Sequence, residues 1–222
     1  MKPILAINLK TYAESTGAPA ISLARKAASI NRQKKMRVIV LAQSVDLRGC
    51  AKTGAEVFAQ HGDAGEPGQH TGRLLMHAIR DAGATGVMLN HAEHKLDWKM
   101  LEQTIGEAHA AKLKTMVCCD HFPEMRKLLH LRPNFIAFEI PELIGTGKSI
   151  TEMEPQSVRA FTRLLGGRGV VPLCGAGVSS AADVRHALEL GTRGALMASA
   201  IAHQANPALA LSKLAAQIAQ KK

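Results

Sequence analysis

Three side chains of the sequence could together move a proton on a carbonyl compound. Lys10, His91 and Glu139 each stand at the end of a short apolar run. A carboxylate can abstract a carbon-bound proton, an imidazole can polarise the neighbouring carbonyl, and an ammonium can stabilise the enediolate that forms. Each residue alone has an ordinary explanation: a snorkelling lysine, a hydrogen-bonded histidine and a loop carboxylate, with Glu142 offering a second carboxylate nearby. Their shared position after apolar runs favours one active site.

Two turns of small residues add the means to hold an anion. The first comprises Gly175, Ala176 and Gly177, and the second contains Ala198 and Ser199. Such turns expose backbone N–H groups that can cradle a phosphate. Together with the three polar side chains, they predict proton abstraction next to a carbonyl on a small phosphorylated substrate.

The elements that must position these residues follow one repeated pattern. Eight short aliphatic runs alternate with longer amphipathic segments, which is typical of buried parallel strands and helices. The predicted strands are residues 4–10, 37–43, 56–61, 86–91, 115–120, 135–140, 170–176 and 194–199. The predicted helices are residues 18–30, 71–81, 98–111, 123–129, 155–165, 181–190 and 207–219, with a weaker one at 47–53. Thr71 and Ser180 are candidate N-caps.

This alternation predicts parallel pairing through right-handed crossovers. Eight units without a linker favour one (β/α)8 barrel domain over residues 1–222, rather than a doubly wound open sheet with fewer strands. In such a barrel the chemistry lies where the strands end. Asn8, Lys10, His91 and Glu139 all fall there.

Composition excludes some other functions. Aromatic residues are 3% of the chain, so stacking platforms for single-stranded nucleic acid are not expected. The formal charge is +10, but no run of Lys or Arg exceeds two residues. We interpret this charge as a solvated surface that also attracts a small anion, and expect no nucleic-acid partner.

The cysteines and the apolar segments bear on location. Four cysteines, without any CxxC pair, predict reduced thiols rather than a disulfide framework or a zinc site. Cys118 and Cys119 are adjacent in a predicted strand and should point to opposite faces. No segment approaches the roughly 20 apolar residues of a membrane span. We therefore expect a cytoplasmic protein without a membrane partner.

At these residues the sequence resembles the triosephosphate isomerases, particularly their short archaeal-type branch. The motifs INLKTY, AQH, HTG, LNHAEH, FEIPELIGTGK, CGAGV and ALMASA occur in the family's order over almost the whole chain. The resemblance implies that Glu139 is the general base, His91 a neutral electrophile and Lys10 an electrostatic stabiliser, as in the pattern known for this family. Asn8 would orient the substrate. Neither a metal nor an organic cofactor is expected, because the chemistry needs only proton transfer.

The resemblance also implies roles outside the catalytic trio. Residues 141–148 would form a mobile lid over the substrate, and Glu93 would support the site by pairing with Lys10. Thr71 would reach across a subunit interface, so a homotetramer or homodimer is expected. Backbone amides in the lid and the small-residue turns would hold the phosphate, at Gly145, Gly175, Ala176, Gly177, Ala198 and Ser199.

Three residues depart from the family's usual pattern. Ile140 stands where the lid hinge usually has proline, Ala92 replaces a serine, and Ala200 occupies a position that is commonly glycine. The first two motivate an alternative in which a catalytically impaired phosphate-binding barrel serves as a ligand-binding or assembly protein. A second alternative is another phosphate-binding barrel enzyme, such as an amino-acid-pathway isomerase or a Schiff-base aldolase. The aldolase would require a lysine inside the barrel, and the predicted strands from 86–91 to 170–176 contain none.

Overall fold

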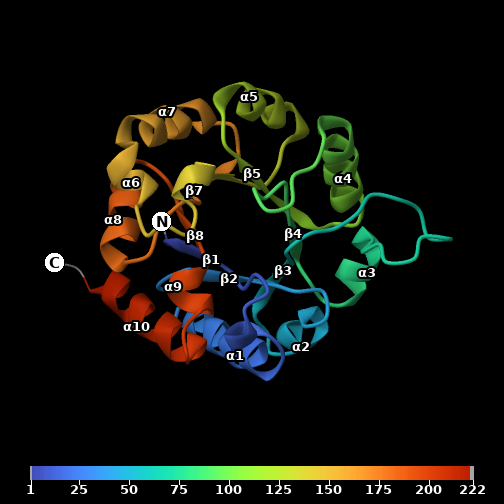
Figure 1. The fold of residues 1–222 in the computed structure, drawn as a ribbon, viewed down its shortest axis with the longest axis horizontal. Helices are drawn as coiled ribbons and strands as arrows, with labels where there is room; N and C mark the ends of the chain where they lie inside the picture. The colour runs from blue at the N-terminus through green and yellow to red at the C-terminus, as the bar shows by residue number, and fades with distance from the viewer. Residues whose placement is uncertain (1, 221–222) are drawn as a thin grey trace.

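The computed structural model describes residues 2–220 and confirms the (β/α)8 class. Eight parallel strands pair in chain order, and β8 pairs with β1, so the sheet closes into a barrel with helices around it (Figure 1). The strands are β1 (Ile4–Asn8), β2 (Arg37–Ala42), β3 (Glu56–Ala59), β4 (Gly86–Leu89), β5 (Lys114–Cys119), β6 (Phe135–Phe138), β7 (Val171–Cys174) and β8 (Gly194–Met197). All eight predicted strands are present.

The helices of the outer ring also follow the predicted order. They are α1 (Ala18–Arg32), α2 (Leu47–Ala51), α3 (Met76–Asp81), α4 (Trp98–Ala110), α5 (Phe122–Leu131), α6 (Ile150–Met153), α7 (Pro155–Leu165), α8 (Ala181–Glu189), α9 (Ser199–Ala202) and α10 (Pro207–Ala219). The bounds of α7 and α10 agree with the prediction, and both begin with proline, whose missing N–H is harmless there. The short helices α6 and α9 and the 3-10 turns η1 (Ala13–Ser15) and η2 (Pro141–Leu143) were not predicted, because they are too short to show a helical period. No helix among residues 2–220 has the length and hydropathy to cross a membrane.

The core consists of two layers on either side of the strands. Side chains inside the barrel include Phe58 and Phe135, whose ring centroids are 6.0 Å apart. The larger layer fills the space between strands and helices. Cys118 belongs to the inner layer and Cys119 to the outer one, as the alternation along a strand predicts.

The strands end earlier than predicted at the barrel mouth. The predicted first and fourth strands extended to Lys10 and His91, whereas β1 ends at Asn8 and β4 at Leu89. Lys10 and Asn90 have φ values of 48° and 61°, which lie outside the β region and turn the chain away from the sheet. The candidate catalytic residues therefore lie on loops just beyond the strands.

The predicted helix at residues 71–81 is wrong in its first turn. The helix α3 begins at Met76 with Leu75 as its N-cap, so Thr71 caps no helix. Residues 62–75 instead form a loop that projects from the ring (Figure 1). Asp63 ties the base of this loop, because its N–H donates to the Leu74 carbonyl at 2.8 Å and its Oδ2 accepts from the Leu74 N–H at 2.7 Å. By contrast, Ser180 caps α8 in a capping box, as predicted.

The prediction that the central strands lack lysine is also wrong. The strand β5 begins one residue earlier than predicted and includes Lys114. Lys114 is exposed at the start of β5, where its Nζ lies 3.2 Å from Glu56 Oε1. Because this is the end of the barrel opposite the mouth, Lys114 is not placed to form an imine with a substrate there.

Candidate active site

The barrel mouth brings together the four polar residues selected from the sequence. Asn8, Lys10, His91 and Glu139 line one cavity, although Asn8 ends β1 and the other three lie on the loops beyond β1, β4 and β6. The same cavity is lined by five of the six predicted phosphate-binding residues, namely Gly145, Gly175, Gly177, Ala198 and Ser199. Residues that are as much as 191 positions apart in the chain, Asn8 and Ser199, therefore share one site.

Glu139 is a buried carboxylate that keeps one oxygen available. Its backbone N–H donates to the Cys119 carbonyl at 3.0 Å, which extends the β5–β6 ladder by one residue. The residue is 3% exposed, and its Oε2 has no hydrogen-bond partner among the described residues. Burial raises the pKa of Glu139 to about 7, against smaller lowering effects of the Cys118 thiol and Lys10. A carboxyl group with such a pKa can accept and return a proton near neutral pH.

His91 faces Glu139 as a neutral imidazole whose Nε2 carries the hydrogen. Its Nε2 lies 3.6 Å from Glu139 Oε1. Its Nδ1 lies 3.2 Å from the backbone N–H of Glu93, which can only donate, so Nδ1 is the unprotonated nitrogen and Nε2 carries the hydrogen. Burial lowers the pKa of His91. The imidazole therefore presents an N–H to the cavity without carrying a charge.

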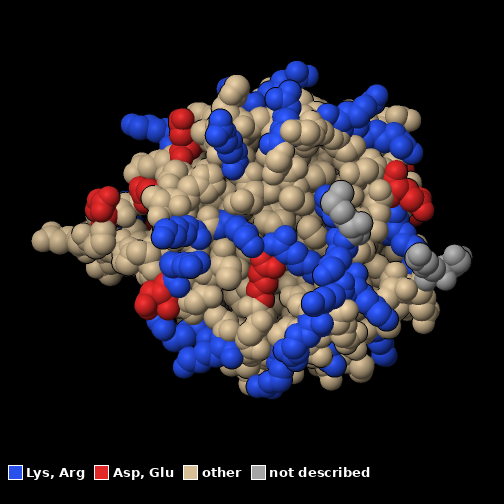
Figure 2. Space-filling view, turned by 180° about the vertical axis from the view of Figure 1, so that it is seen from behind, with Lys and Arg blue, Asp and Glu red and all other residues tan. Residues whose placement is uncertain are grey.

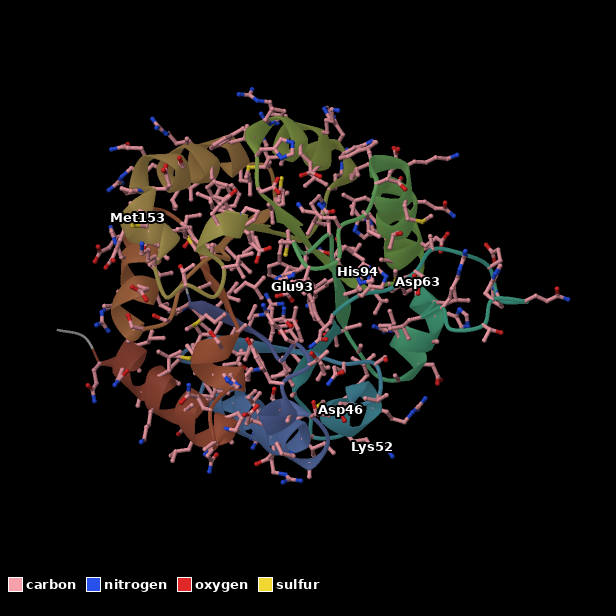
Figure 3. The ribbon with its side chains drawn as sticks, in the orientation of Figure 1. Asp46, Lys52, Asp63, Glu93, His94 and Met153 are labelled. Atoms are coloured by element: carbon pink, nitrogen blue, oxygen red, sulfur yellow. The ribbon has the colours of Figure 1, made fainter. Side chains whose placement is uncertain are left out.

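Lys10 is held at the cavity by both its backbone and its side chain. Its N–H donates to Asn8 Oδ1 at 3.0 Å, and its carbonyl accepts from Gln60 Nε2 at 3.0 Å. Its Nζ forms an ion pair with Glu93, as predicted, and Glu93 lies near the centre of the ring (Figure 3). A non-glycine residue at a φ of 48° is strained, and such strain is concentrated at functional sites.

The turn after β7 contributes space as well as backbone. A Cβ added to Gly175 would lie 2.4 Å from Glu139 Cγ, so only glycine allows the carboxylate its position. The N–H of Gly175 donates to the Phe138 carbonyl at 2.8 Å and is therefore committed within the barrel. Gly177 has a φ of 67°, and its added Cβ would collide with the Lys148 carbonyl at 1.8 Å. Gly177 thus lets the end of the predicted lid pack closely on this turn.

Some residues selected from the sequence do not line the cavity, and Ala176 is the one among them that was expected to bind the phosphate. Ala176 was expected to bind phosphate, but it is fully buried, does not line the cavity, and its carbonyl accepts from the Ile150 N–H at 3.1 Å. Thr71 is exposed on the projecting loop 62–75. Glu142, the second candidate carboxylate, is exposed in η2 and is not among the lining residues.

Several residues that line the cavity were not selected from the sequence. Tyr12 lies in the cavity wall, and its ring stacks on that of His203 at 4.7 Å, which joins the β1–α1 loop to the chain after α9. Tyr12 stood within the INLKTY motif, so that motif carried a signal for it. Ile144 and Gly147 also line the cavity and belong to the predicted lid, whereas Val178, Ser179, Leu196 and Met197 were not selected.

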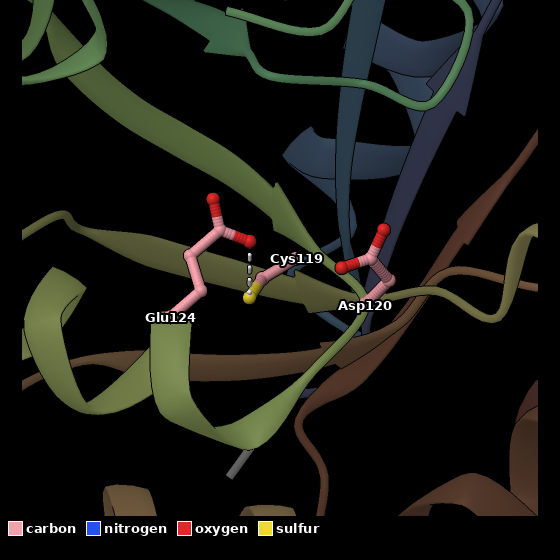
Figure 4. Close-up of side chains that lie close together, drawn as sticks. All are labelled: Cys119, Asp120 and Glu124. Atoms are coloured by element: carbon pink, nitrogen blue, oxygen red, sulfur yellow. Dashed lines mark hydrogen bonds between the residues drawn. The ribbon is translucent and has the colours of Figure 1, made fainter. Parts of the chain in front are cut away.

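One cluster outside the cavity has the atoms of a metal site. Ligand atoms of Cys119, Asp120 and Glu124 all lie within 4.8 Å of one another (Figure 4). Each already has an internal partner: the Cys119 thiol donates to Glu124 Oε2 at 3.2 Å, and Lys95 Nζ lies 2.9 Å from Asp120. Burial also raises the pKa of Cys119, which keeps the thiol protonated. The cluster is complete as a hydrogen-bonded network, and we assign it no metal.

Known proteins resemble this chain along nearly its whole length. The triosephosphate isomerase family model matches residues 3–217. Triosephosphate isomerase of Methanosarcina acetivorans is 34% identical over 217 residues, covering 96% of this chain and 97% of that protein. The enzyme of Methanocaldococcus jannaschii is 36% identical over 214 residues, covering 95% and 98%.

A solved structure shows the same fold. The crystal structure of triosephosphate isomerase from Bartonella henselae has a TM-score of 0.67 at 17% identity, and covers 96% of this chain and 100% of that chain. The solved structure shows the fold alone. The family model and the archaeal relatives match almost the whole chain and therefore also identify the family. This chain belongs to the triosephosphate isomerase family.

Proposed function

We propose that the mouth cavity interconverts dihydroxyacetone phosphate and D-glyceraldehyde 3-phosphate, with Glu139, His91 and Lys10 as its catalytic residues. The family assignment makes the chain an intramolecular isomerase and places its reaction in glycolysis and gluconeogenesis. The observation that supports the residue assignment best is the buried Glu139 carboxylate, with Oε2 unpartnered and Oε1 3.6 Å from His91 Nε2. A glutamate base facing a neutral imidazole is the pattern known for this family.

In this proposal the proton moves between two carbons through an enediolate. Glu139 takes a proton from C1 of dihydroxyacetone phosphate, and His91 Nε2–H stabilises the charge that develops on the carbonyl oxygen. Lys10 adds its positive charge to the same side of the cavity. Glu139 then returns the proton to C2, while His91 transfers the hydroxyl proton between the two oxygens. The proton taken from C1 is returned to C2, so the reaction has no net gain or loss of atoms or electrons and balances without a cofactor or a metal.

We further propose that backbone amides around the cavity bind the phosphate. Gly145, Gly177, Ala198 and Ser199 line it from the lid and from the turns after β7 and β8. Gly175 is not proposed as a phosphate ligand, because its N–H donates to the Phe138 carbonyl. Its lack of a side chain leaves room for Glu139. In this scheme residues 141–148 act as the lid that excludes water from the enediolate.

A homodimer or homotetramer is the proposed assembly, with Thr71 at an interface. Thr71 is exposed on the loop 62–75, which projects beyond the ring (Figure 1). A second cavity of about 520 Å³ opens beside the catalytic one and shares Lys10 and His91 with it, so a partner's loop there would adjoin the site. Light scattering on the purified protein tests the assembly, and Thr71→Arg should dissociate it if the loop is the contact. We also propose a cytoplasmic location, consistent with four unpaired, buried cysteines.

Turnover of glyceraldehyde 3-phosphate, coupled to the reduction of dihydroxyacetone phosphate, tests the function. We expect rapid turnover by the wild-type protein and a loss of about 10²–10⁴-fold in Glu139→Gln, because the base is removed. Near-full turnover of Glu139→Gln would remove Glu139 as the base. A folded wild-type protein without turnover that binds an enediolate mimic would instead favour the impaired, ligand-binding barrel, with Ile140 as the first residue to revert to proline.

A further inference from the structure

We propose that Asn90 is a positioning residue that holds the His91 loop in its catalytic place through one buried side-chain amide. This inference rests on the proposed role of His91 and assigns a role to the residue before it. Asn90 is 1% exposed and follows directly after β4. Its φ of 61° turns the chain out of the strand, and asparagine tolerates this left-handed region better than most residues.

The Asn90 amide ties together the start of this loop, its end and the neighbouring strand. Its Nδ2 donates to the Cys118 carbonyl of β5 at 3.0 Å. Its Oδ1 accepts from the backbone N–H of Leu96 at 3.1 Å, six residues further along the chain. The segment from His91 to Leu96 is therefore closed into a loop whose two ends are fixed by the same side chain.

Glu124, in the first turn of α5, fixes the orientation of that amide. Asn90 Nδ2 donates to Glu124 Oε1 at 3.2 Å as well as to the Cys118 carbonyl, whereas Oδ1 faces an N–H. A flipped amide would place an oxygen against two acceptors and an NH₂ against a donor, so only one orientation satisfies every group. The other oxygen of Glu124 accepts from the Cys119 thiol, which holds the carboxylate in turn (Figure 4).

The loop from His91 to Leu96 contains the hydrogen-bonding groups that leave the hydrogen on His91 Nε2. The Glu93 N–H that selects the His91 tautomer lies inside it, and so does a turn in which the His94 N–H donates to the His91 carbonyl at 2.8 Å. The loop's two ion pairs, Glu93 with Lys10 and Lys95 with Asp120, use side chains that are 58% and 41% exposed. Exposed pairs hold a loop weakly. Of the side chains named here that hold the loop, Asn90 is the buried one.

The Asn90→Gly substitution removes the amide and keeps a backbone that accepts positive φ. A misplacement of about 1 Å at a reacting group costs about 10²-fold, so we expect kcat to fall by about 10–10²-fold. The affinity for 2-phosphoglycolate, which mimics the enediolate, should fall with kcat. The affinity for inorganic phosphate, which would contact only the backbone turns, should not change. This separation distinguishes a misplaced His91 from general damage to the site.

A matched control lies at the other end of the barrel. Asn31 also donates to one backbone carbonyl and accepts from one N–H, both of Val38, at 2.9 and 2.6 Å. We expect Asn31→Gly to lower stability and leave kcat unchanged. If Asn90→Gly does not fold, Glu124→Ala frees the amide on one side and should lower kcat by a smaller factor, of about 2–10-fold.

Three results would overturn the proposal. One is a folded Asn90→Gly protein, or Glu124→Ala where the first does not fold, with wild-type kcat. Another is a parallel loss of 2-phosphoglycolate and phosphate binding, and the third is an equal loss of kcat in Asn31→Gly. Wild-type turnover is measured beside each variant. Its absence would defeat the proposed function, whereas wild-type turnover with an unaffected Asn90→Gly defeats only the role of Asn90.

Discussion

Glu139 at the barrel mouth is buried and Glu56 at the opposite end is partly buried, and the surroundings of these two carboxylates differ. Glu56 Oε2 lies 2.8 Å from Arg37 Nε, and Oε1 lies 2.6 Å from Arg37 Nη2 and 3.2 Å from Lys114 Nζ. Burial raises the pKa of Glu56, but these two cations outweigh it and leave the pKa below its ordinary value. Glu139 Oε2 has no hydrogen-bond partner within residues 2–220, and burial raises the pKa of Glu139 to about 7.

The difference shows which end of the barrel stabilises the fold and which end performs chemistry. A carboxylate with satisfied oxygens and a low pKa is a poor base, whereas a carboxylate desolvated without a full set of partners costs stability and readily takes a proton. The barrel thus places the destabilising group where the substrate would bind. It places the carboxylate whose oxygens are satisfied by Arg37 and Lys114 where the strands begin.

Backbone conformation follows the same division. Lys34, Lys112 and Arg132 have positive φ at exposed turns between a helix and the next strand. At the mouth, the positive-φ residues Lys10 and Asn90 are partly or fully buried and flank the catalytic loops. The exposed turns only reverse the chain, whereas the buried ones aim functional side chains.

The barrel end where the strands begin also accounts for part of the high positive charge. Seen from behind, the molecule presents many Lys and Arg side chains (Figure 2). Helices of the barrel end on this side, with Arg32, Arg80 and Arg163 in the last turns of α1, α3 and α7. Cations at helix C-termini are favoured by the helix dipole. This supports a solvated basic surface rather than a nucleic-acid site.

After Glu139→Gln, the largest effect expected at the mouth is that of Lys10→Met on turnover. Because we propose that this cation stabilises the oxyanion, its removal should lower kcat/KM by about 10²–10³-fold. Lys95→Met is the control, because Lys95 pairs with Asp120 and does not line the cavity, so its effect through solvent should stay within about threefold. Equal rates for Lys10→Met and the wild type would refute the role of Lys10.

The two carboxylates should respond to amide substitution with opposite signs. Folding raises the pKa of Glu139 from about 4.5 to about 7, so the stability from its bound proton is present below pH 4.5 and is lost as the pH rises through 7. Glu139→Gln carries no charge and should be more stable than the wild type at alkaline pH, by up to about 3 kcal/mol. Urea unfolding in alkaline and in mildly acidic buffer measures the difference in the free energy of unfolding between Glu139→Gln and the wild type. If this difference in the free energy of unfolding did not become smaller on acidification, the result would contradict a raised pKa of Glu139.

Gly175→Ala tests the close approach to the base. The new Cβ would lie 2.4 Å from Glu139 Cγ, so the carboxylate must move, and kcat should fall by about 10–10²-fold. Gly106→Ala in α4 is the matched control, because its Cβ would meet no atom within 4 Å. That variant should keep its rate and gain about 0.5–1 kcal/mol of stability. Similar rates for both variants would show that the space beside Glu139 is not needed.

The pH dependence of the rate follows from the same carboxylate. Only the ionised form of Glu139 can accept a proton, so kcat/KM should fall as the pH drops through about 7, by about tenfold per pH unit below it. The Glu56→Gln variant should show the same profile, since Glu56 is at the other end of the barrel. A wild-type profile that is flat from pH 8 to 6 would show that Glu139 titrates lower than its burial implies.

The smallest effect expected is that of Glu56→Gln on stability. Because the pKa of Glu56 is lowered in the folded state, its charge stabilises the fold above its ordinary pKa, and this contribution is lost as the pH falls through the lowered value. The ion pairs are partly exposed, so the loss at neutral pH should be about 1 kcal/mol. Turnover should not change. A neutral or stabilising substitution would show that the pairs only balance the cost of burial.

Much of the fold could be predicted from local pattern. The continuous apolar runs located all eight strands, and Pro155 and Pro207 marked the first residues of α7 and α10. Thr71 was wrongly predicted as a helix N-cap. No local sequence feature shows that the Leu74 N–H and carbonyl form hydrogen bonds with Asp63 rather than within a helix. The short elements α6 and α9 escaped prediction because four residues cannot display a helical period.

The sequence by itself determined the order of the elements, the residues at strand ends and the family. Tertiary structure decided which of those residues share the cavity and how each is buried and hydrogen-bonded. Burial raises the pKa of Glu139 only because β6 places it beside β5 and Gly175, and the Glu93 N–H selects the His91 tautomer only in the folded loop. Ala176, chosen with its neighbours from sequence, proved to lie outside the cavity. Periodicity and motifs are local properties of a chain, whereas desolvation and hydrogen-bond geometry depend on residues brought from far along it.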